Sequence, residues 1–451
     1  MAKLGTKILI LLLAILLAGI GIMSMILLNA DTGEISVVRI PAQDIDALEF
    51  KSGGEAVRLE RNGMDWSYGD NANIPVSGDA VINCVLQLSN LTAIDIYKVS
   101  SEKMPDYGID GQKSLTVHHS SQKTELLIGS LTPDQSGIYV GKTGSTEIFA
   151  VALNAGYFLQ GGADRFIDPV LIEETGEDAA YDVIKFEGGY GLHLKRKTTQ
   201  QEADRSLTIS TYRMLAPYGY DADTGALAEF FGSFQGLRAT GVYLAGGIHN
   251  RLGEYGLDNP FVRLSYTLNG REHTVSISET RGDGNAAVTA DGIDVIYSLD
   301  AQTVASMLIP PERMVSNLPY GVELNKLEGM AITCGQTVYD IRMTGEDSQM
   351  KASCNGNQVD TKNVQDYYNV FLTARREGLS DQAGGIPVLT AVFTKRNGLS
   401  DTIEFLTLNA QYYLVRINGQ SGMLSNKQTV DIIAENTARL AKNEKIEVAV
   451  G

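Results

Sequence analysis

The longest uncharged, largely hydrophobic run lies near the N-terminus, at residues 8–28. This run holds no charged residue, and its only breaks are Gly19, Gly21 and Ser24. At about 1.5 Å of rise per residue, a helix of this length spans roughly 31 Å, close to the hydrocarbon thickness of a bilayer. We therefore predict a transmembrane helix at residues 8–28.

The charges beside this run indicate how it is oriented. Lys3 and Lys7 precede it, together with the amino terminus, and Asp31 and Glu34 follow it. Because positive residues are enriched on the cytoplasmic side, residues 1–7 are expected in the cytoplasm and the body outside. The sequence thus predicts a single-pass protein of the cell membrane with an extracytoplasmic body.

A cleaved signal peptide is the alternative interpretation of the same run. Its apolar core would usually hold about 7–15 residues, followed by a small-x-small cleavage site. Leu28-Asn29-Ala30 is a poor match to such a site. A mature N-terminus at Asp31 in the native host would refute the retained anchor.

After the anchor, two five-residue segments resemble each other. Residues 106–110 are Asp-Tyr-Gly-Ile-Asp, and residues 254–258 are Glu-Tyr-Gly-Leu-Asp. Apolar and polar positions alternate after each segment, at residues 114–119 and 262–268, and this period of two predicts a half-buried antiparallel strand. Asn269-Gly270 then predicts a tight hairpin turn, since both residues tolerate positive φ.

The residues before each Tyr-Gly segment also match. Ser77 is expected to cap one helix and Thr224 to begin another, each with apolar residues at helical spacing and a strand after it. Before each helix the pattern predicts strands. The apolar residues of the two helices are Val81, Val85, Leu86 and Leu88 in the first and Leu227, Phe230, Phe231 and Phe234 in the second, and the following strands are residues 93–99 and 240–245.

A third, more degenerate copy is predicted toward the C-terminus. Asp360 is expected to cap its helix and Ser425 to open a closing helix. Its corner, residues 377–381, lacks the tyrosine, and the strand between helix and corner is expected to be missing. The strands predicted here are residues 330–344, 351–354, 389–394, 402–408 and 412–417.

These patterns predict an α+β protein. An N-terminal transmembrane helix is followed by two or three diverged repeats of antiparallel sheet with packed helices. The predicted repeats are residues 36–160, 180–310 and 322–442.

Net charge and cysteine usage narrow the function classes. The 451 residues carry a formal charge of −17, which disfavours nucleic acid and anionic lipid headgroups as partners. The three cysteines, Cys84, Cys334 and Cys354, are expected to be free thiols. One intervening strand would hold Cys334 and Cys354 near 10 Å apart, beyond the roughly 7 Å that a disulfide allows.

The sequence carries no catalytic signature. His118 and His119 are adjacent on a predicted strand and therefore face opposite sides, and no zinc spacing, phosphate-binding loop or nucleophile elbow is present. Asp283-Gly284-Asn285 and Asp291-Gly292 resemble fragments of calcium loops but are expected to form hairpin turns. We name no catalytic, cofactor-binding or metal-binding residue, and we expect a protein that is not an enzyme and needs no cofactor.

The Tyr-Gly segments admit two interpretations. In the structural one, glycine supplies an unusual φ, the next aliphatic residue enters the core, and the aspartate bonds to its own turn. In the functional one, Tyr107 and Tyr255 contact a ligand. From the sequence alone, the ligand-binding residues are unknown.

The arrangement resembles the bacterial family named domain of unknown function 4340. The features that carry the resemblance are the anchored N-terminus, a strand-rich start ending in Trp66, the two corners, and the segments 127–129 and 137–140. It covers residues 36–310 well and 320–440 weakly. The resemblance implies a protein anchored outside the cytoplasmic membrane, whose gene often accompanies ABC-type export or gliding components. It implies no agreed activity.

Three functional hypotheses follow. The first is a non-enzymatic accessory or scaffold protein that partners a membrane complex such as an ABC transporter, through a body anchored by residues 8–28. The second is a module that binds a cell-envelope polymer, glycan or small ligand. The third is a secreted hydrolase, which would require two close carboxylates or a base–nucleophile pair in a cleft.

Overall fold

A computed structural model describes residues 35–175, 181–345, 349–382 and 384–447. The predicted transmembrane helix and cytoplasmic N-terminus lie outside these residues. Within the described residues, every helix is too short or too polar to span a bilayer. The chain divides into two compact units. The first comprises residues up to Pro169, with Ala239–Arg251 and Gly292–Ser298, and the second comprises Val170–Arg238, Leu252–Asp291 and Leu299–Gly451.

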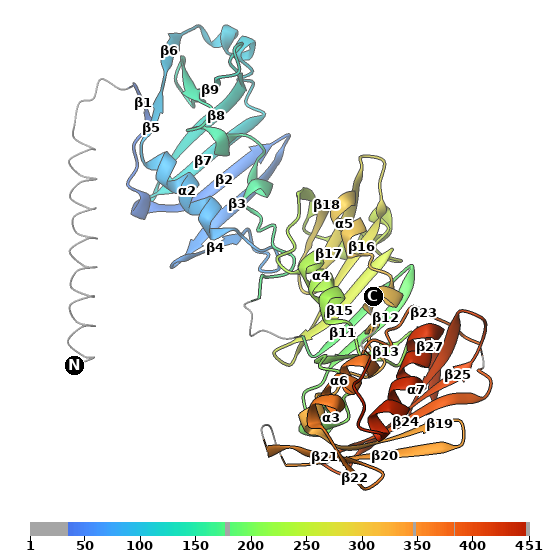
Figure 1. The fold of residues 1–451 in the computed structure, drawn as a ribbon. Coiled ribbons are helices and arrows are strands. Elements are labelled where there is room, and N and C mark those ends of the chain that lie inside the picture. The colour runs from blue at the N-terminus through green and yellow to red at the C-terminus, as the bar shows by residue number, and fades with distance from the viewer. Residues whose placement is uncertain (1–34, 176–180, 346–348, 383, 448–451) are drawn as a thin grey trace, which may run out of the picture. The chain divides into compact units, whose positions relative to one another are not determined.

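The first large sheet has eight strands in the order β4-β3-β2-β7-β8-β9-β10-β6 (Figure 1). All of its pairings are antiparallel. A small sheet, β1 (Ile35–Val38) with β5 (Leu91–Ala93), accompanies it. The strands are β2 (Ile45–Ser52), β3 (Glu55–Asn62), β4 (Asp65–Tyr68), β6 (Asp95–Lys98), β7 (Lys113–His119), β8 (Gln122–Leu131), β9 (Gly137–Lys142) and β10 (Glu147–Ala152).

The second large sheet has the order β13-β12-β11-β15-β16-β17-β18-β14. Asn269 and Gly270 have φ of 52° and 76° and join β15 to β16 in two residues, so the predicted hairpin turn is confirmed. The strands are β11 (Val183–Gly188), β12 (Tyr190–Arg196), β13 (Tyr212–Ala216), β14 (Gly241–Ala245), β15 (Val262–Leu268), β16 (Arg271–Thr280), β17 (Asn285–Ala290) and β18 (Val295–Asp300).

The third large sheet has nine strands in the order β22-β21-β20-β19-β24-β25-β26-β27-β23. As predicted, no strand lies in the described residues between the helix at Thr361–Phe371 and the corner at residues 377–381. The corner residues themselves form β23 (Gly378–Leu379), which pairs with β27 at the edge of the sheet. The others are β19 (Leu327–Cys334), β20 (Thr337–Thr344), β21 (Lys351–Cys354), β22 (Asn357–Val359), β24 (Pro387–Lys395), β25 (Ser400–Thr407), β26 (Tyr412–Ile417) and β27 (Gln420–Asn426).

The three large sheets share one strand order. In each sheet, the strands that precede the helix in sequence lie at one edge, and the four strands of a meander lie beside them. The strand that comes between the helix and the meander in sequence (β6, β14 or β23) lies at the opposite edge. The fold is therefore α+β with several antiparallel sheets and packed helices, as predicted, and the sheets are consistent with repeats. The boundaries predicted for these repeats stay predictions.

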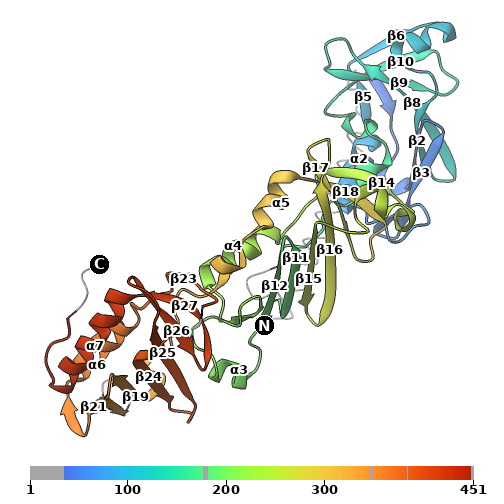
Figure 2. The same ribbon diagram turned by 90° about the vertical axis from the view of Figure 1, so that its right-hand side faces the viewer.

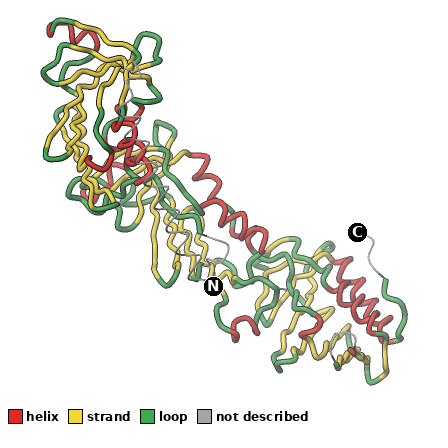
Figure 3. Tube along the Cα trace, turned by 90° about the vertical axis from the view of Figure 1, so that its left-hand side faces the viewer, coloured by secondary structure: helices red, strands yellow, loops and turns green. Residues whose placement is uncertain are grey.

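Each large sheet carries a helix whose N-terminus is capped by a side chain. Ser77 caps α2 (Gly78–Ser89), Asp223 caps α4 (Thr224–Phe234) and Asp360 caps α6 (Thr361–Phe371). The predicted caps Ser77 and Asp360 are thus confirmed, while the second helix is capped one residue before Thr224. Figure 3 shows these short helices among strands and loops that make up most of the trace.

Leu86 belongs to the apolar residues predicted for the first helix, but it is exposed, and Cys84 lies on the buried face beside Val81, Val85 and Leu88. The predicted start of the closing helix is wrong. The closing helix α7 (Lys427–Ala441) is capped by Asn426, because Ser425 is still part of β27. Either side chain can cap a helix, so strand pairing decides between them.

The two Tyr-Gly corners are helix caps of one kind. Each ends a 3₁₀ helix, η2 (Ser101–Tyr107) or η6 (Leu252–Tyr255), with a glycine at φ 73° or 72°. The glycine N–H donates to the carbonyl three residues back, and the next N–H donates to the carbonyl five residues back, as in a Schellman motif. The following residue, Ile109 or Leu257, is buried.

The remaining sequence features fall where the patterns placed them. All three cysteines are free, and β20 separates Cys334 on β19 from Cys354 on β21. Asp283 accepts a hydrogen bond from the Asn285 amide at 3.1 Å within the turn that joins β16 to β17, as expected for a hairpin. The φ of Gly292 is 74°, which fits the turn between β17 and β18.

Candidate functional site

The densest group of buried charges lies in the second unit, where the second and third sheets meet. It is built from the segment after β12, the short helix α3 (Gln200–Asp204), the segment around β13, and the turn from β24 to β25. A capping box fixes α3, because Thr199 accepts from the Glu202 amide while Glu202 accepts from the Thr199 amide. Glu202 also accepts from Lys195 at 2.6 Å, and these bonds lower its pKa to about 2.

The first buried ion pair joins Lys197 to Asp221. Lys197 Nζ lies 2.9 Å from Asp221 Oδ1, with the two side chains only 8% and 1% exposed. Nζ also donates to Ser206 Oγ and, at 2.8 Å, to the Ser210 carbonyl. Burial lowers the pKa of Lys197, and the negative charge of Asp221 opposes that shift.

The second oxygen of Asp221 holds the chain around it. Oδ2 accepts from the Leu207 amide at 3.1 Å, and from the amide and hydroxyl of Thr208 at 3.1 and 3.0 Å. One carboxylate therefore fixes both a lysine and a stretch of backbone. Removing such a buried partner leaves an uncompensated charge behind.

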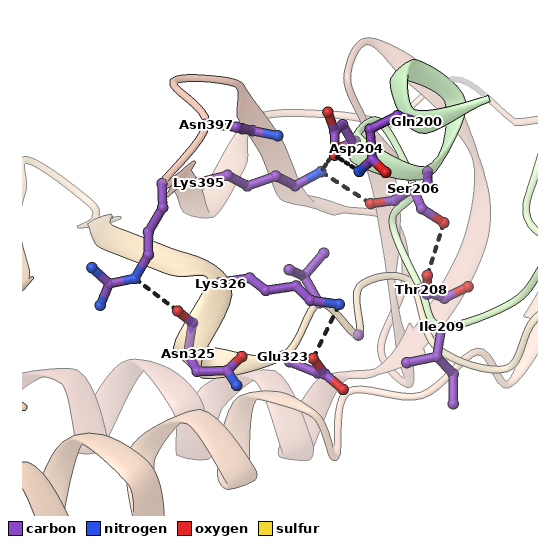
Figure 4. A pocket seen from close by; sticks show the side chains of 14 residues that line it. Gln200, Asp204, Ser206, Thr208, Ile209, Glu323, Asn325, Lys326, Lys395 and Asn397 are labelled. Atoms are coloured by element: carbon purple, nitrogen blue, oxygen red, sulfur yellow. Dashed lines mark hydrogen bonds and ion pairs between the residues drawn. The ribbon is translucent and has the colours of Figure 1, made fainter. Parts of the chain in front are cut away.

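The second buried ion pair joins Lys395 to Asp401. Lys395 Nζ lies 2.8 Å from Asp401 Oδ2, with side chains 6% and 8% exposed. The same Nζ donates to the carbonyls of Asp204 and Ser206 at 2.8 and 3.0 Å, as Figure 4 shows. A lysine of the third sheet thus holds the end of α3.

Two cavities flank these ion pairs, and Lys395 lines both. The Lys326 cavity, of about 520 Å³, is lined among others by Glu323, Asn325, Lys326 and Arg396. Its exposed cations already have partners: Lys326 pairs with Glu323 at 3.0 Å (Figure 4), and Arg396 donates to the Asn325 carbonyl at 2.7 Å.

The Arg205 cavity, of about 590 Å³, lies on the other side of Lys395. It is lined by six cations and three carboxylates, together with Leu215, Leu399, Ser400 and Asn418. The cations are Lys195, Arg196, Lys197, Arg205, Arg213 and Lys395, and the carboxylates are Glu202, Asp221 and Asp401. This cavity is therefore basic, although the whole chain carries a charge of −17.

The two buried pairs suit a structural role. Each lysine ammonium faces a carboxylate and backbone or hydroxyl oxygens, so its donors are in use. Acid–base catalysis would require a titratable group within reach of a substrate proton. The two ion pairs can hold α3 and the β24–β25 turn together. They thereby fix the walls of the basic cavity beside them.

The histidines and tyrosines considered from the sequence do not converge on this site. His118 lies 3.2 Å from Glu49 and His119 lies 3.0 Å from Thr124, so the two face different partners, as their alternation predicted. Within the described ranges, no three side chains of the metal-binding types come together. Tyr107 and Tyr255 lie at the caps, in separate units.

Residues 66–260 match the model of a family described as Domain of unknown function (DUF4340). The chain carries a DUF4340 domain. No curated protein and no solved structure matches the chain. The match confirms the resemblance drawn from the corners, since the DUF4340 domain holds both of them.

The DUF4340 domain holds only half of the buried ion-pair cluster. Lys197 and Asp221 lie inside the matched residues, while Lys395 and Asp401 lie outside them, in the third sheet. Sequence reasoning overlooked all four residues. A signal was available for two: Lys395 continues the inward face of Leu389, Ala391 and Phe393, and Asp401 shares its face with Ile403 and Phe405. A charge in an inward register needs a buried partner.

Proposed function

We propose that this chain is a non-enzymatic accessory or scaffold protein of the cell membrane. Residues 8–28 would anchor it, and its body of three diverged repeats would act outside the cytoplasm beside a membrane complex, such as an ABC-type exporter. The shared strand order of the three sheets supports the repeats. The apolar run supports the anchor, and the family resemblance supports the exporter.

One observation supports the scaffold function: in the part of the chain that the structure describes, the first sheet has one α-helix fewer beside it than the second and third sheets have. In the second sheet, α5 (Ala301–Met307) follows the last meander strand, β18, and packs on α4. In the third sheet, α7 follows the last meander strand, β27, and packs on α6 (Figures 1 and 2). After β10 of the first sheet come only two 3₁₀ turns, η3 (Tyr157–Leu159) and η4 (Ala163–Phe166). Among the described residues, α2 therefore has no α-helical neighbour of the kind that α4 and α6 have.

Helix α2 has an exposed apolar face. Ile82 and Leu86, one helical turn apart, are 49% and 56% exposed. A largely apolar cavity of about 660 Å³ adjoins another side of α2, where Ala80, Cys84 and Phe158 are among its lining residues, and neither Ile82 nor Leu86 lines it. Exposed apolar side chains that lie next to each other, as Ile82 and Leu86 do, can mark an interaction site on a soluble domain.

The sister helices indicate what this face would bind. Helix α5 buries Val304 and Met307, and α7 buries Val430 and Ile433, in both cases three residues apart. The partner proposed for α2 is accordingly an amphipathic helix of a membrane-complex subunit, with apolar residues at the same spacing.

Co-purification from native membranes tests this function. The tagged full chain is expected to retain a membrane-complex subunit in mild detergent. The double variant Ile82→Ser/Leu86→Ser is expected to lose that subunit while keeping its fold, because both side chains are exposed. Quantitative mass spectrometry of the eluates measures the loss.

A matched control removes apolar surface elsewhere. Met64→Ser/Val338→Ser changes two residues that are also exposed but are not part of α2, and it should keep the subunit. Failure of the unmodified chain to retain any membrane subunit would overturn the scaffold function. Equal retention by both double variants would overturn the assignment of the α2 face.

A further inference from the structure

The Arg205 cavity holds more positive charge than its carboxylates neutralise. Four of its six cations each have a carboxylate of their own: Lys195 with Glu202 at 2.6 Å, Arg196 with Asp182 at 2.6 Å, Lys197 with Asp221 at 2.9 Å, and Lys395 with Asp401 at 2.8 Å. Arg205 has no carboxylate partner in the described residues, and Arg213 only shares Asp221 with Lys197, at 4.0 Å. The cavity therefore carries about two uncompensated positive charges.

Arg205 is an exposed side chain that forms no hydrogen bond or ion pair with any residue in the described parts of the chain. It follows α3 directly, and the bonds of the capping box and of Lys395 hold that helix in place. Its backbone is thus fixed while its guanidinium stays available to a ligand.

Arg213 is only partly engaged. Its Nη2 donates to the Gly219 carbonyl at 2.7 Å, and its Nη1 lies 4.0 Å from Asp221 Oδ1, an oxygen that Lys197 approaches more closely. Burial lowers the pKa of Lys197, and the positive charges of Arg213 and Lys395 lower it further. Positive potential therefore accumulates on this wall of the cavity.

We propose that the Arg205 cavity binds a phosphate group carrying close to two negative charges. Guanidinium groups match phosphate oxygens in forked hydrogen bonds, and two of them balance the charge of about −1.5 to −2 that a phosphate monoester carries at neutral pH. A carboxylate would balance only one. The Ser400 hydroxyl lines the same cavity and can donate a further bond.

The phosphate can come free from solution or as an ester on a larger envelope molecule, and the cavity of about 590 Å³ has room for either. This site is independent of the α2 face, which belongs to the other unit. The scaffold function and phosphate binding can therefore fail separately.

Isothermal titration calorimetry of the purified full chain in mild detergent tests the proposal, in phosphate-free buffer at low salt. One arm uses inorganic phosphate and the other glycerol 3-phosphate. Saturable one-to-one binding is expected in at least one arm, and the tighter arm identifies the source. Arg205→Ala should weaken binding about tenfold or more, and Arg205→Lys should recover only part of it, because lysine lacks the fork.

Arg271→Ala is the matched control, since Arg271 is exposed in the same unit but lies outside the cavity. It should leave the affinity within about twofold. The melting temperature of each variant checks folding, and Arg205→Ala should not change it because the side chain is exposed. Lack of saturable binding in both arms would overturn the proposal. Equal weakening by Arg205→Ala and Arg271→Ala would also overturn it, by showing only general attraction.

Discussion

The two Tyr-Gly corners share a sequence, a cap and a backbone conformation, but they have different surroundings. At the first corner a Cβ on Gly108 would lie 2.1 Å from Ser130 Oγ and 2.7 Å from the Ser130 amide nitrogen. At the second, a Cβ on Gly256 would meet nothing closer than Ser278 Cβ at 3.5 Å. Both corners face a bulge in the second meander strand, but only the first is pressed against it.

The tyrosines differ more than the glycines do. Tyr107 packs edge-on against Tyr139 at 4.9 Å and tilts against Tyr97 at 6.0 Å, in an aromatic cluster. Tyr255 instead has the Arg281 guanidinium 4.9 Å from its ring. The cap thus explains the shared glycine and aliphatic residue, while each tyrosine serves its own neighbourhood. This favours the structural interpretation of the tyrosines over a common ligand.

The buried aliphatic residue of each cap should give the largest effect, equal at the two corners. Ile109→Ala and Leu257→Ala are each expected to lower the free energy of unfolding by about 2–5 kcal/mol, through lost burial and a cavity. Trp66, the only tryptophan, lies in the first unit, so its fluorescence follows Ile109→Ala in denaturant. Far-UV circular dichroism follows Leu257→Ala.

Leu131→Ala provides the control, because Leu131 is a partly exposed residue of β8 near the first corner. This substitution should lower the free energy of unfolding by less than about 1 kcal/mol. If Leu257→Ala cost no more than this control, the second corner would not anchor its sheet, and the likeness between the corners would be superficial.

Local features of the fold were open to prediction, since each depends on a few adjacent residues. The caps at Ser77 and Asp360 and the turn at Asn269-Gly270 are examples. Strand β23 was not, because a two-residue edge strand has no periodicity and forms only where β27 offers an edge. The contact of Lys395 with the Asp204 and Ser206 carbonyls was not open to prediction either, because it joins segments that lie far apart in the sequence.

The glycines themselves should separate the corners. Gly256→Ala is expected to lower the free energy of unfolding by about 1–2 kcal/mol, because a residue with a Cβ is strained in a left-handed backbone conformation. Gly108→Ala should cost about 1–3 kcal/mol more, because the new methyl group meets the Ser130 backbone and the strand must shift. Denaturant unfolding of both variants measures the difference.

The double variant Gly108→Ala/Ser130→Gly sharpens this test. It removes the hydroxyl that lies 2.1 Å from the added Cβ but keeps the amide nitrogen at 2.7 Å, so only part of the loss should return. Equal costs for the two single variants would show that the backbone at the first corner yields freely and that its close packing is unimportant.

The tyrosines should give the smallest effects, and double-mutant cycles can resolve them. Tyr107 and Tyr139 should couple by about 0.5–1.5 kcal/mol, as edge-on aromatic pairs do. Tyr255 and Arg281 should couple by about 0.5–1 kcal/mol, as exposed cation–π pairs do. The cycles Tyr107→Leu/Tyr139→Leu and Tyr255→Leu/Arg281→Gln measure both terms by denaturant unfolding. Zero coupling at both corners would remove the structural reason for two tyrosines at equivalent positions, and a role in contacting a ligand would then be the better explanation.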